Sequence, residues 1–195
     1  AASADNAIKR MCDIIASLIG IILLTPVWII VAAMVRLHDG GPAFFKQERV
    51  GLDGTSFTMF KFRTMHVDAE AMKASLAEAN EADASAGNSV MFKMANDPRI
   101  TRIGAFLRKT SIDELPQLFN VLRGDMSLVG PRPPLPSEVA QYEPRVLGKF
   151  AVRPGITGLW QISGRSNLSW DETVHLDLSY AQHRSLTLDA WIMLQ

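Results

Sequence analysis

Cysteine is almost absent from this chain, since Cys12 is the only one among 195 residues. A single thiol excludes an internal disulfide framework and a zinc site built from cysteines. The formal net charge is zero, so we expect no nucleic-acid partner. The sequence has no P-loop or dinucleotide-binding glycine spacing, and no histidine pair with the spacing of a zinc site. A catalytic or binding site in this chain must therefore be built from residues outside these familiar motifs.

Hydrophobic residues are abundant, at 48% with a mean hydropathy of +0.09, which is high for a soluble domain of this length. Residues 14–35 carry no charge. At about 1.5 Å per helical residue, this run is long enough to cross a bilayer. Thr25 and Pro26 lie at its midpoint, and Pro26 removes one helix hydrogen bond. We therefore expect the helix to break there.

Basic residues flank this apolar run on both sides: Lys9, Arg10, Arg36, Lys46, Arg49, Lys61 and Arg63. Because basic flanks favour the cytoplasmic side of a membrane, a straight span would place one group on the wrong side. A re-entrant helix, which enters and leaves on the cytoplasmic face, satisfies both flanks. The alternatives are an ordinary kinked span, a buried helix of a soluble protein, and a signal peptide, for which the run is too long.

Short elements are expected along the rest of the chain. Strands are predicted at Phe44–Val50 and Ser56–Arg63 around a turn at Asp53-Gly54, and Lys61 and Arg63 then share one strand face. That face is equally compatible with plain exposure to solvent. Further predictions are a turn at Asp97-Pro98, a buried strand at 126–130, and helices at residues 100–109, 137–149 and 170–183, the last of them capped by Ser169. A solvent-facing helix followed by a loop is expected within 67–87.

Two adjacent carboxylates, Asp113 and Glu114, are the main candidates for chemistry. Pro116 fits a first helical turn, so we expect both carboxylates at a helix N-terminus, where the dipole favours anions. Such a place keeps a carboxylate ionised and suits a divalent metal. The alternative is a simple helix cap, because Ser111 to Glu114 matches the S-x-x-E capping box.

Two further segments are candidates for binding phosphate. Arg132 lies between Pro131 and Pro133, which hold it extended, and arginine suits bidentate phosphate recognition. The alternative is a rigid surface turn. Residues 153–165 contain three glycines, two arginines and Trp160, and glycine loops let backbone N–H groups approach phosphate. Without a known spacing, this second segment is weak evidence.

Taken together, these segments resemble the bacterial sugar transferase family, the monotopic phosphoglycosyl transferases. The similarity covers essentially the whole chain apart from residues 67–87. It rests on residues 9–13, 45–51, 60–65, 97–104, 107–118, 120–133 and 154–161. The family often has Ser-Pro at the helix break, whereas this chain has Thr25-Pro26, and threonine can also bond back to a helix carbonyl.

The resemblance implies an α/β, mostly α, monotopic membrane protein with a re-entrant N-terminal helix, amphipathic interfacial helices and a small β element. Residues 1–40 would form the re-entrant helix and its flanks. Residues 41–195 would form a catalytic domain, with a variable insert at 66–90, facing the cytoplasm from the bacterial inner membrane. Because the chain lacks an initial Met and ends within an apolar pattern, we expect a piece of a longer protein. A homodimer is left open.

The resemblance also implies an activity: transfer of a sugar-1-phosphate from a UDP-sugar to undecaprenyl phosphate, with release of UMP. Asp113 would be the nucleophile of a covalent aspartyl intermediate, and Glu114 would hold Mg²⁺. The phosphate-binding residues would be Arg132, Lys61, Arg63 and Arg99. The sequence does not specify the sugar. The alternatives are a catalytically idle membrane scaffold of a glycan assembly complex and a polyprenyl-phosphate phosphatase.

Overall fold

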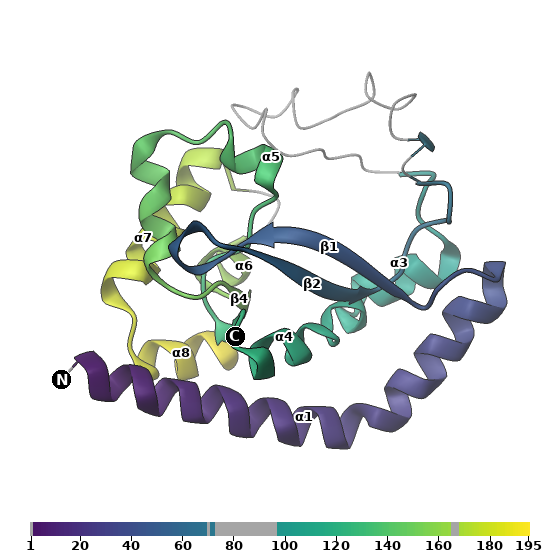
Figure 1. Ribbon diagram of the computed structural model, residues 1–195, viewed down its shortest axis with the longest axis horizontal. Helices are drawn as coiled ribbons and strands as arrows, with labels where there is room; N and C mark the ends of the chain where they lie inside the picture. Colours follow the sequence, from purple (N-terminus) through teal and green to yellow (C-terminus); the bar gives the residue numbers. More distant parts are fainter. Residues whose placement is uncertain (1, 70, 73–96, 165–167) are drawn as a thin grey trace. The chain divides into compact units, whose positions relative to one another are not determined.

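The computed structural model describes residues 2–69, 71–72, 97–164 and 168–195 (Figure 1). These residues are mostly helical, with two small sheets. The helices are α1 (Ala2–Asp39), α3 (Arg102–Lys109), α4 (Gln117–Arg123), α5 (Pro136–Val139), α6 (Leu159–Ile162), α7 (Trp170–His183) and α8 (Leu186–Met193). The strands are β1 (Phe44–Val50), β2 (Ser56–Phe62), β3 (Ser127–Val129) and β4 (Gly155–Thr157). Most of the predicted 66–90 insert lies outside the described residues.

The chain forms two compact units. Unit 1 comprises residues 1–22, 47–59 and 117–195, and unit 2 comprises residues 23–46 and 60–116. The division falls inside α1 and inside the β1–β2 hairpin, so both elements contribute to both units. The predicted division into a membrane segment, 1–40, and a catalytic domain, 41–195, depends on which residues enter a membrane. It stays a prediction.

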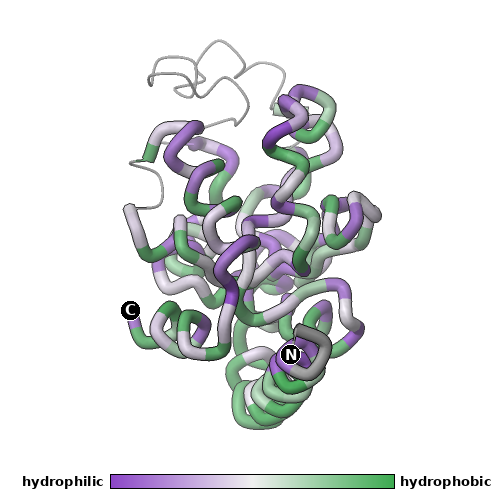
Figure 2. Tube along the Cα trace, turned by 90° about the vertical axis from the view of Figure 1, so that its left-hand side faces the viewer, coloured by the Kyte–Doolittle hydropathy of each residue, from purple (hydrophilic) through white to green (hydrophobic). Residues whose placement is uncertain are grey.

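The long N-terminal helix α1 continues without interruption through Thr25 and Pro26, so the break expected there does not interrupt the helix. Its segment Asp5–Asp39 is long and apolar enough to cross a membrane. Figure 2 shows the hydrophobic colour along most of this helix. Many of its large apolar side chains are exposed, among them Ile22 (69%) and Leu23 (71%). These features are compatible with membrane association, since an exposed apolar surface of this size needs a partner or a lipid.

The first turns of α1 are bonded to the rest of unit 1. Lys9 donates to Asp189 at 2.5 Å, and Arg10 donates to two carbonyl oxygens near the C-terminal end of α4 at 2.6 and 2.9 Å. Asp13, which is buried, accepts from the backbone N–H of Leu128 at 3.1 Å. The charged residues that precede the apolar run therefore fix the start of α1 to folded structure.

A parallel pair of strands organises the core of unit 1. In β3 and β4, Ser127 lies opposite Gly155 and Val129 opposite Thr157. Around them lie two clusters of buried side chains, composed of Val129, Val152, Tyr180 and Ile192, and of Met59, Val121 and Met126. The predicted strand at 126–130 is confirmed as β3, whereas β4 lies in the glycine-rich segment and was not predicted.

The glycines of this segment serve close backbone packing. A Cβ atom on Gly155 would overlap the backbone of Gly130, and one on Gly158 would overlap the carbonyl oxygen of Gly130. Only glycine fits where two strands approach so closely. Close backbone packing therefore explains Gly155 and Gly158, which the sequence had suggested as part of a phosphate-binding loop.

Local signals in the sequence located other elements with varying accuracy. Helix α7 begins after Ser169, which caps it as predicted by accepting from the backbone N–H of Glu172. Helix α3 begins after the cap Thr101, two residues later than expected. The predicted helix at 137–149 is wrong. It is replaced by α5 and a 3₁₀ segment that starts at Pro144, because Glu143 before the proline is extended (φ −67°, ψ 151°).

Candidate active site

The two adjacent carboxylates lie in a single 3₁₀ turn, Ile112–Glu114, between α3 and α4. Both carboxylates occupy the first turn of this short 3₁₀ helix, but they do not belong to the longer helix that was expected to continue from them, because α4 begins only at Gln117, after Pro116. The capping-box alternative is wrong, since the Ser111 side chain makes no cap hydrogen bond. Ser111 instead adopts a left-handed conformation (φ 57°, ψ 16°), which is costly for a residue other than glycine and is concentrated at functional sites.

Asp113 is a buried carboxylate, with 7% of the residue exposed. Burial raises its pKa above the ordinary value, and the charge of Glu114 adds to this, whereas Lys61 and Arg108 act in the opposite direction. Among the described residues, no ion pair involves Asp113. A desolvated carboxylate with a raised pKa is more basic, and therefore a better nucleophile once ionised, than one in water.

Glu114 is neutralised by a cation from the neighbouring strand. Its Oε1 accepts from the Nζ of Lys61, the penultimate residue of β2, at 2.7 Å. The two side chains are 35% and 24% exposed, so the pair contributes little to stability and can open to a ligand. Lys61 and Glu114 were predicted separately as site residues, and the structure brings them together.

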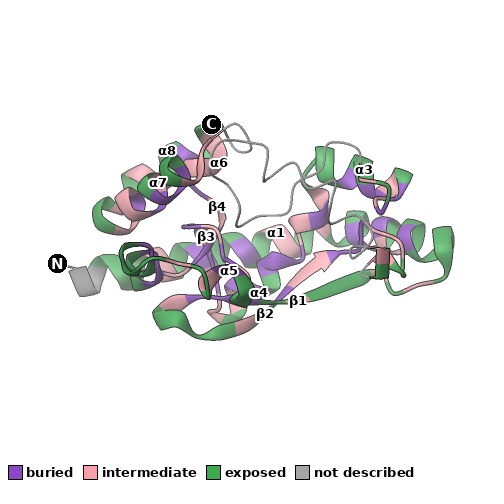
Figure 3. Ribbon diagram, turned by 90° about the horizontal axis from the view of Figure 1, so that it is seen from above, coloured by how far each residue is buried: buried purple, intermediate pink, exposed green. Residues whose placement is uncertain are grey.

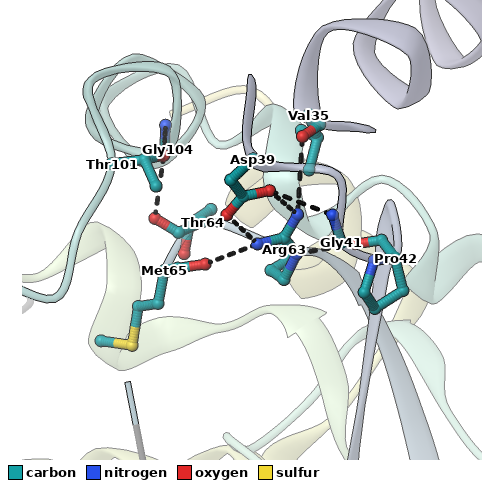
Figure 4. Close-up of polar contacts among 9 residues, drawn as sticks. All are labelled: Val35, Asp39, Gly41, Pro42, Arg63, Thr64, Met65, Thr101 and Gly104. Atoms are coloured by element: carbon teal, nitrogen blue, oxygen red, sulfur yellow. Dashed lines mark hydrogen bonds and ion pairs between the residues drawn. The ribbon is translucent and has the colours of Figure 1, made fainter. Parts of the chain in front are cut away.

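Arg63 directs its guanidinium elsewhere (Figure 4). It pairs with Asp39, at the end of α1, through both Nη atoms at 2.5 Å. Its remaining donors reach the carbonyl oxygens of Pro42 (2.7 Å), Met65 (3.2 Å) and Val35 (3.5 Å). Every N–H donor of Arg63 thus has an acceptor, and a phosphate would have to displace one. Its phosphate-binding role stays a prediction.

Arg99 is likewise bound to a carboxylate. It donates to Asp97 through Nε at 2.8 Å and through Nη2 at 2.6 Å, and Arg99 is 6% exposed. This hydrogen-bonded pairing lowers the pKa of Asp97. Arg99 follows the predicted Asp97-Pro98 turn, which is confirmed. A role for Arg99 in phosphate binding stays a prediction.

Helix α3 is seated on the segment after β2 and thereby fixes the start of the turn that carries Asp113. The N–H of Thr101 donates to the carbonyl oxygen of Thr64 at 3.0 Å, and Arg108 Nε donates to the Thr64 hydroxyl at 2.9 Å. A Cβ atom on Gly104 would overlap the Thr64 carbonyl, so glycine is required there. The sequence showed Arg108 only as part of an amphipathic helix, and no local signal placed its charge near Asp113.

Arg132 belongs to unit 1, where it forms a bidentate pair with Glu138 of α5 at 3.0 and 3.2 Å. Glu138 also accepts from the backbone N–H of Leu135 at 2.7 Å. Burial acts to raise the pKa of Glu138, but the charge and hydrogen bonds of Arg132 hold it below the usual value. The Arg132 side chain remains 25% exposed, so one edge of it faces solvent. No pattern in the sequence indicates that Glu138 is its partner.

The described residues contain no group of three or more histidine, cysteine or acidic side chains that could hold a metal ion by themselves. Asp113 and Glu114 are the carboxylates that the site offers. This donor set fits Mg²⁺, which is commonly bound by one or two carboxylates together with substrate phosphates and water. The predicted Mg²⁺ site at Glu114 stays a prediction.

Comparison with known proteins gives matches along nearly the whole chain. The family model for bacterial sugar transferase matches residues 4–195. The galactosyl transferase CpsE of Streptococcus agalactiae is 49% identical over 95% of this chain and 40% of that protein. The undecaprenyl-phosphate galactose phosphotransferase of Salmonella typhimurium is 44% identical, over 95% of this chain and 39% of that protein.

A third relative matches a similar share of this chain and a larger share of its own length. The UDP-glucose:undecaprenyl-phosphate glucose-1-phosphate transferase of Caulobacter vibrioides is 39% identical over 96% of this chain and 67% of that protein. The chain spans about two fifths of the length of the Streptococcus and Salmonella relatives.

Proposed function

The chain belongs to the bacterial sugar transferase family, and on this basis we propose that it transfers a sugar-1-phosphate from a UDP-sugar to undecaprenyl phosphate and releases UMP. Undecaprenyl phosphate appears in the names of the Salmonella and Caulobacter relatives, which supports it as the acceptor proposed here. The observation that carries the proposal within this chain is Asp113. It is buried, its pKa is raised, and within the described ranges no ion pair neutralises it, while Lys61 already neutralises its neighbour Glu114.

In the proposed reaction, Asp113 acts as a nucleophile. A carboxylate oxygen attacks the sugar-linked phosphorus of the UDP-sugar, the bond to the bridging oxygen breaks, and that oxygen leaves with UMP. A phosphate oxygen of undecaprenyl phosphate then attacks the same phosphorus and releases the Asp113 carboxylate. Each displacement forms one phosphorus–oxygen bond and breaks another, so no oxidant, reductant or further reactant is needed.

The charged residues predicted from the sequence have separate proposed roles. Lys61 neutralises phosphate charge near Asp113, and its bond to Glu114 opens when substrate arrives, because both side chains are partly exposed. Glu114 would hold Mg²⁺, which supplies charge neutralisation of the diphosphate when bound. Arg132, presented between prolines with one exposed edge, and Arg99 bind further phosphate oxygens. Arg63 contributes by holding the end of α1 through Asp39.

The topology proposed for α1 is re-entrant, with both ends on the cytoplasmic face of the inner membrane. Lys9, Arg10 and Asp13 bond the first turns to folded polar structure in unit 1. Asp39 bonds the last turn to Arg63 in unit 2, and Trp28 packs against Phe62 with ring centroids 6.5 Å apart. Basic residues flank both ends of the helix, and such residues favour the cytoplasmic side, so a span with one end outside the cell is disfavoured.

The central test is release of UMP from a panel of UDP-sugars by the purified chain, with and without undecaprenyl phosphate. We expect one or a few sugars to give UMP together with a lipid-linked sugar diphosphate. UMP must depend on a UDP-sugar. Phosphate release from undecaprenyl phosphate alone would indicate a phosphatase, and no turnover with any donor would favour an idle scaffold.

A further inference from the structure

An open hollow of about 490 Å³ lies at the C-terminal end of α1, within unit 2. It is lined by the last turns of the helix, the turn that follows, and the first residues of β1. The lining combines small apolar side chains with two cations: Ala32, Ala33, Arg36, Pro42, Ala43, Phe44 and Lys46. None of these residues has a role in the proposed reaction.

Among the residues that the structure describes, no acidic side chain pairs with either cation of the hollow. Within the described part of the chain, neither Arg36 nor Lys46 takes part in an ion pair, whereas Arg63 and Arg99 of the same unit each bind an aspartate. Lys46 lies over the ring of Phe60, 5.9 Å from its centroid, which holds the ammonium group in place without cancelling its charge. Two uncompensated cations beside one hollow favour an anionic ligand.

An exposed apolar stripe leads away from these cations along α1. Ile29 precedes Ala33 by four residues and Arg36 by seven, so the three lie on one face of the helix. Ile29 is 65% exposed. The neighbouring Ile30, Met34 and Leu37 are exposed as well, at 59%, 42% and 86%. A ligand that fits both features has one anionic head and a long apolar tail.

The hollow and the Lys61–Glu114 pair lie on opposite faces of the β1–β2 hairpin. Phe44 stacks on Phe62 with centroids 5.1 Å apart, and Lys46 lies over Phe60, so these residues share one face. Lys61 stands between Phe60 and Phe62 in β2, so it points to the other face, where it bonds Glu114. Figure 3 shows the first half of β1 as exposed. A ligand in the hollow is therefore separate from the reacting groups.

We propose that this hollow binds the phosphate headgroup of an anionic phospholipid, with Arg36 and Lys46 on the phosphate and an acyl chain along Ile29 and Ala33. The lipid would hold the C-terminal end of α1 at headgroup level. The inference rests on the membrane association proposed above and not on the transfer reaction. Two basic residues near an anionic lipid surface strengthen binding by about thirtyfold together.

The test compares lipid binding by the full chain purified in an uncharged detergent, using native mass spectrometry and the midpoint of thermal unfolding. Phosphatidylglycerol is titrated against phosphatidylcholine, without UDP-sugar. The variant is Arg36→Gln with Lys46→Gln. The matched control is Arg102→Gln with Lys109→Gln, which removes the same charge from exposed positions of α3. A second variant, Arg36→Lys with Lys46→Arg, retains both charges.

We expect phosphatidylglycerol to bind the parent, the control and the charge-retaining variant and to raise their unfolding midpoints, and its affinity for the Gln pair to fall about thirtyfold. Equal affinity in the Gln pair and the parent overturns the proposal, and so does an equal fall in the control. Displacement of the lipid by inorganic phosphate at constant ionic strength would mean a free-phosphate site. A KM for undecaprenyl phosphate that is higher in the Gln pair than in the parent, in lipid-free detergent, would mean an acceptor site. Either of these two outcomes also overturns the phospholipid proposal, and either can occur while the transfer reaction itself proceeds.

Discussion

At the scale of single residues, Asp113 and Glu114 have different surroundings although they are adjacent. Asp113 is buried with a raised pKa, whereas Glu114 is held by Lys61. We predict that Asp113→Asn lowers turnover by about 10⁴-fold or more, because the amide cannot form the acyl phosphate. Parent protein given a UDP-sugar without acceptor should gain the mass of a phosphosugar, located on Asp113 by peptide mapping.

The matched control for this substitution is Asp53→Asn. Asp53 lies in the hairpin turn at φ 54°, a conformation that asparagine tolerates, so the control should retain activity. An adduct on any other residue would refute the assignment, as would activity of Asp113→Asn within about tenfold of the parent.

Glu138 supports a prediction about pH. Its pKa is held below the ordinary value of 4.5 by Arg132, so its contribution to stability is fully present above pH 4.5 and is lost as the pH falls through the lowered pKa. Glu138→Gln should therefore destabilise the protein by about 1–3 kcal/mol at pH 7, and by progressively less in acid. Denaturant unfolding at a series of pH values measures the difference.

The control for this prediction is Glu143→Gln. Glu143 pairs with Arg145 at 2.8 Å, but its side chain is 69% exposed. Such a pair contributes about 0–1 kcal/mol, so the substitution should have little effect at any pH. If the two variants lose the same stability with the same pH dependence, the Arg132–Glu138 pair is not the cause.

At the scale of elements, α1 is the helix that is long and apolar enough to cross a membrane, and its proposed topology can be tested. Because Pro26 leaves one carbonyl of the helix without its N–H partner, Pro26→Ala should favour a straight span and carry one flank across the bilayer, with loss of activity. Asn6 and Glu48 are both exposed and can be replaced by cysteine, one at a time, in a Cys12→Ser background. Labelling by an impermeant maleimide in intact cells then reports on which side of the membrane each flank lies. Asp39 is unsuitable as a reporter because it bonds Arg63.

We expect both reporters to stay protected in the parent and Asn6→Cys to become labelled in the Pro26→Ala variant. Labelling of exactly one flank in the parent would establish an ordinary span and refute the re-entrant topology. Since each end of α1 is bonded within its own unit, the Pro26→Ala chain must also break the contacts of Lys9 and Arg10, which a lowered unfolding midpoint would report.

At the scale of the whole molecule, the proposed chemistry depends on a metal that the described side chains cannot hold alone. Glu114 supplies carboxylate oxygens, and the diphosphate of the donor supplies others. We predict that activity disappears in EDTA and returns with Mg²⁺ or Mn²⁺. Glu114→Gln should raise the Mg²⁺ concentration needed for half-maximal rate, and activity undiminished by EDTA would exclude the metal.

Elements with local signals could be predicted from the sequence. The hairpin around Asp53-Gly54, the cap at Ser169 and the strand β3 follow from turn residues, capping chemistry and short apolar runs, each of which acts within a few positions. The helix at 137–149 failed because Pro144 forces the preceding residue out of the helical conformation. Strand β4 failed because its glycines resemble a loop until a partner strand lies beside them.

The sequence by itself determined the family, the apolar helix α1 and the candidate residues Asp113, Glu114 and Arg132, because these depend on residue type and local order. Only the tertiary structure decided the partners of the charges. Lys61 meets Glu114 across 53 residues and Arg63 meets Asp39 across 24, so no local pattern links them. Burial and pairing depend on which segments pack together, and these contacts separate a desolvated Asp113 from a neutralised Glu114.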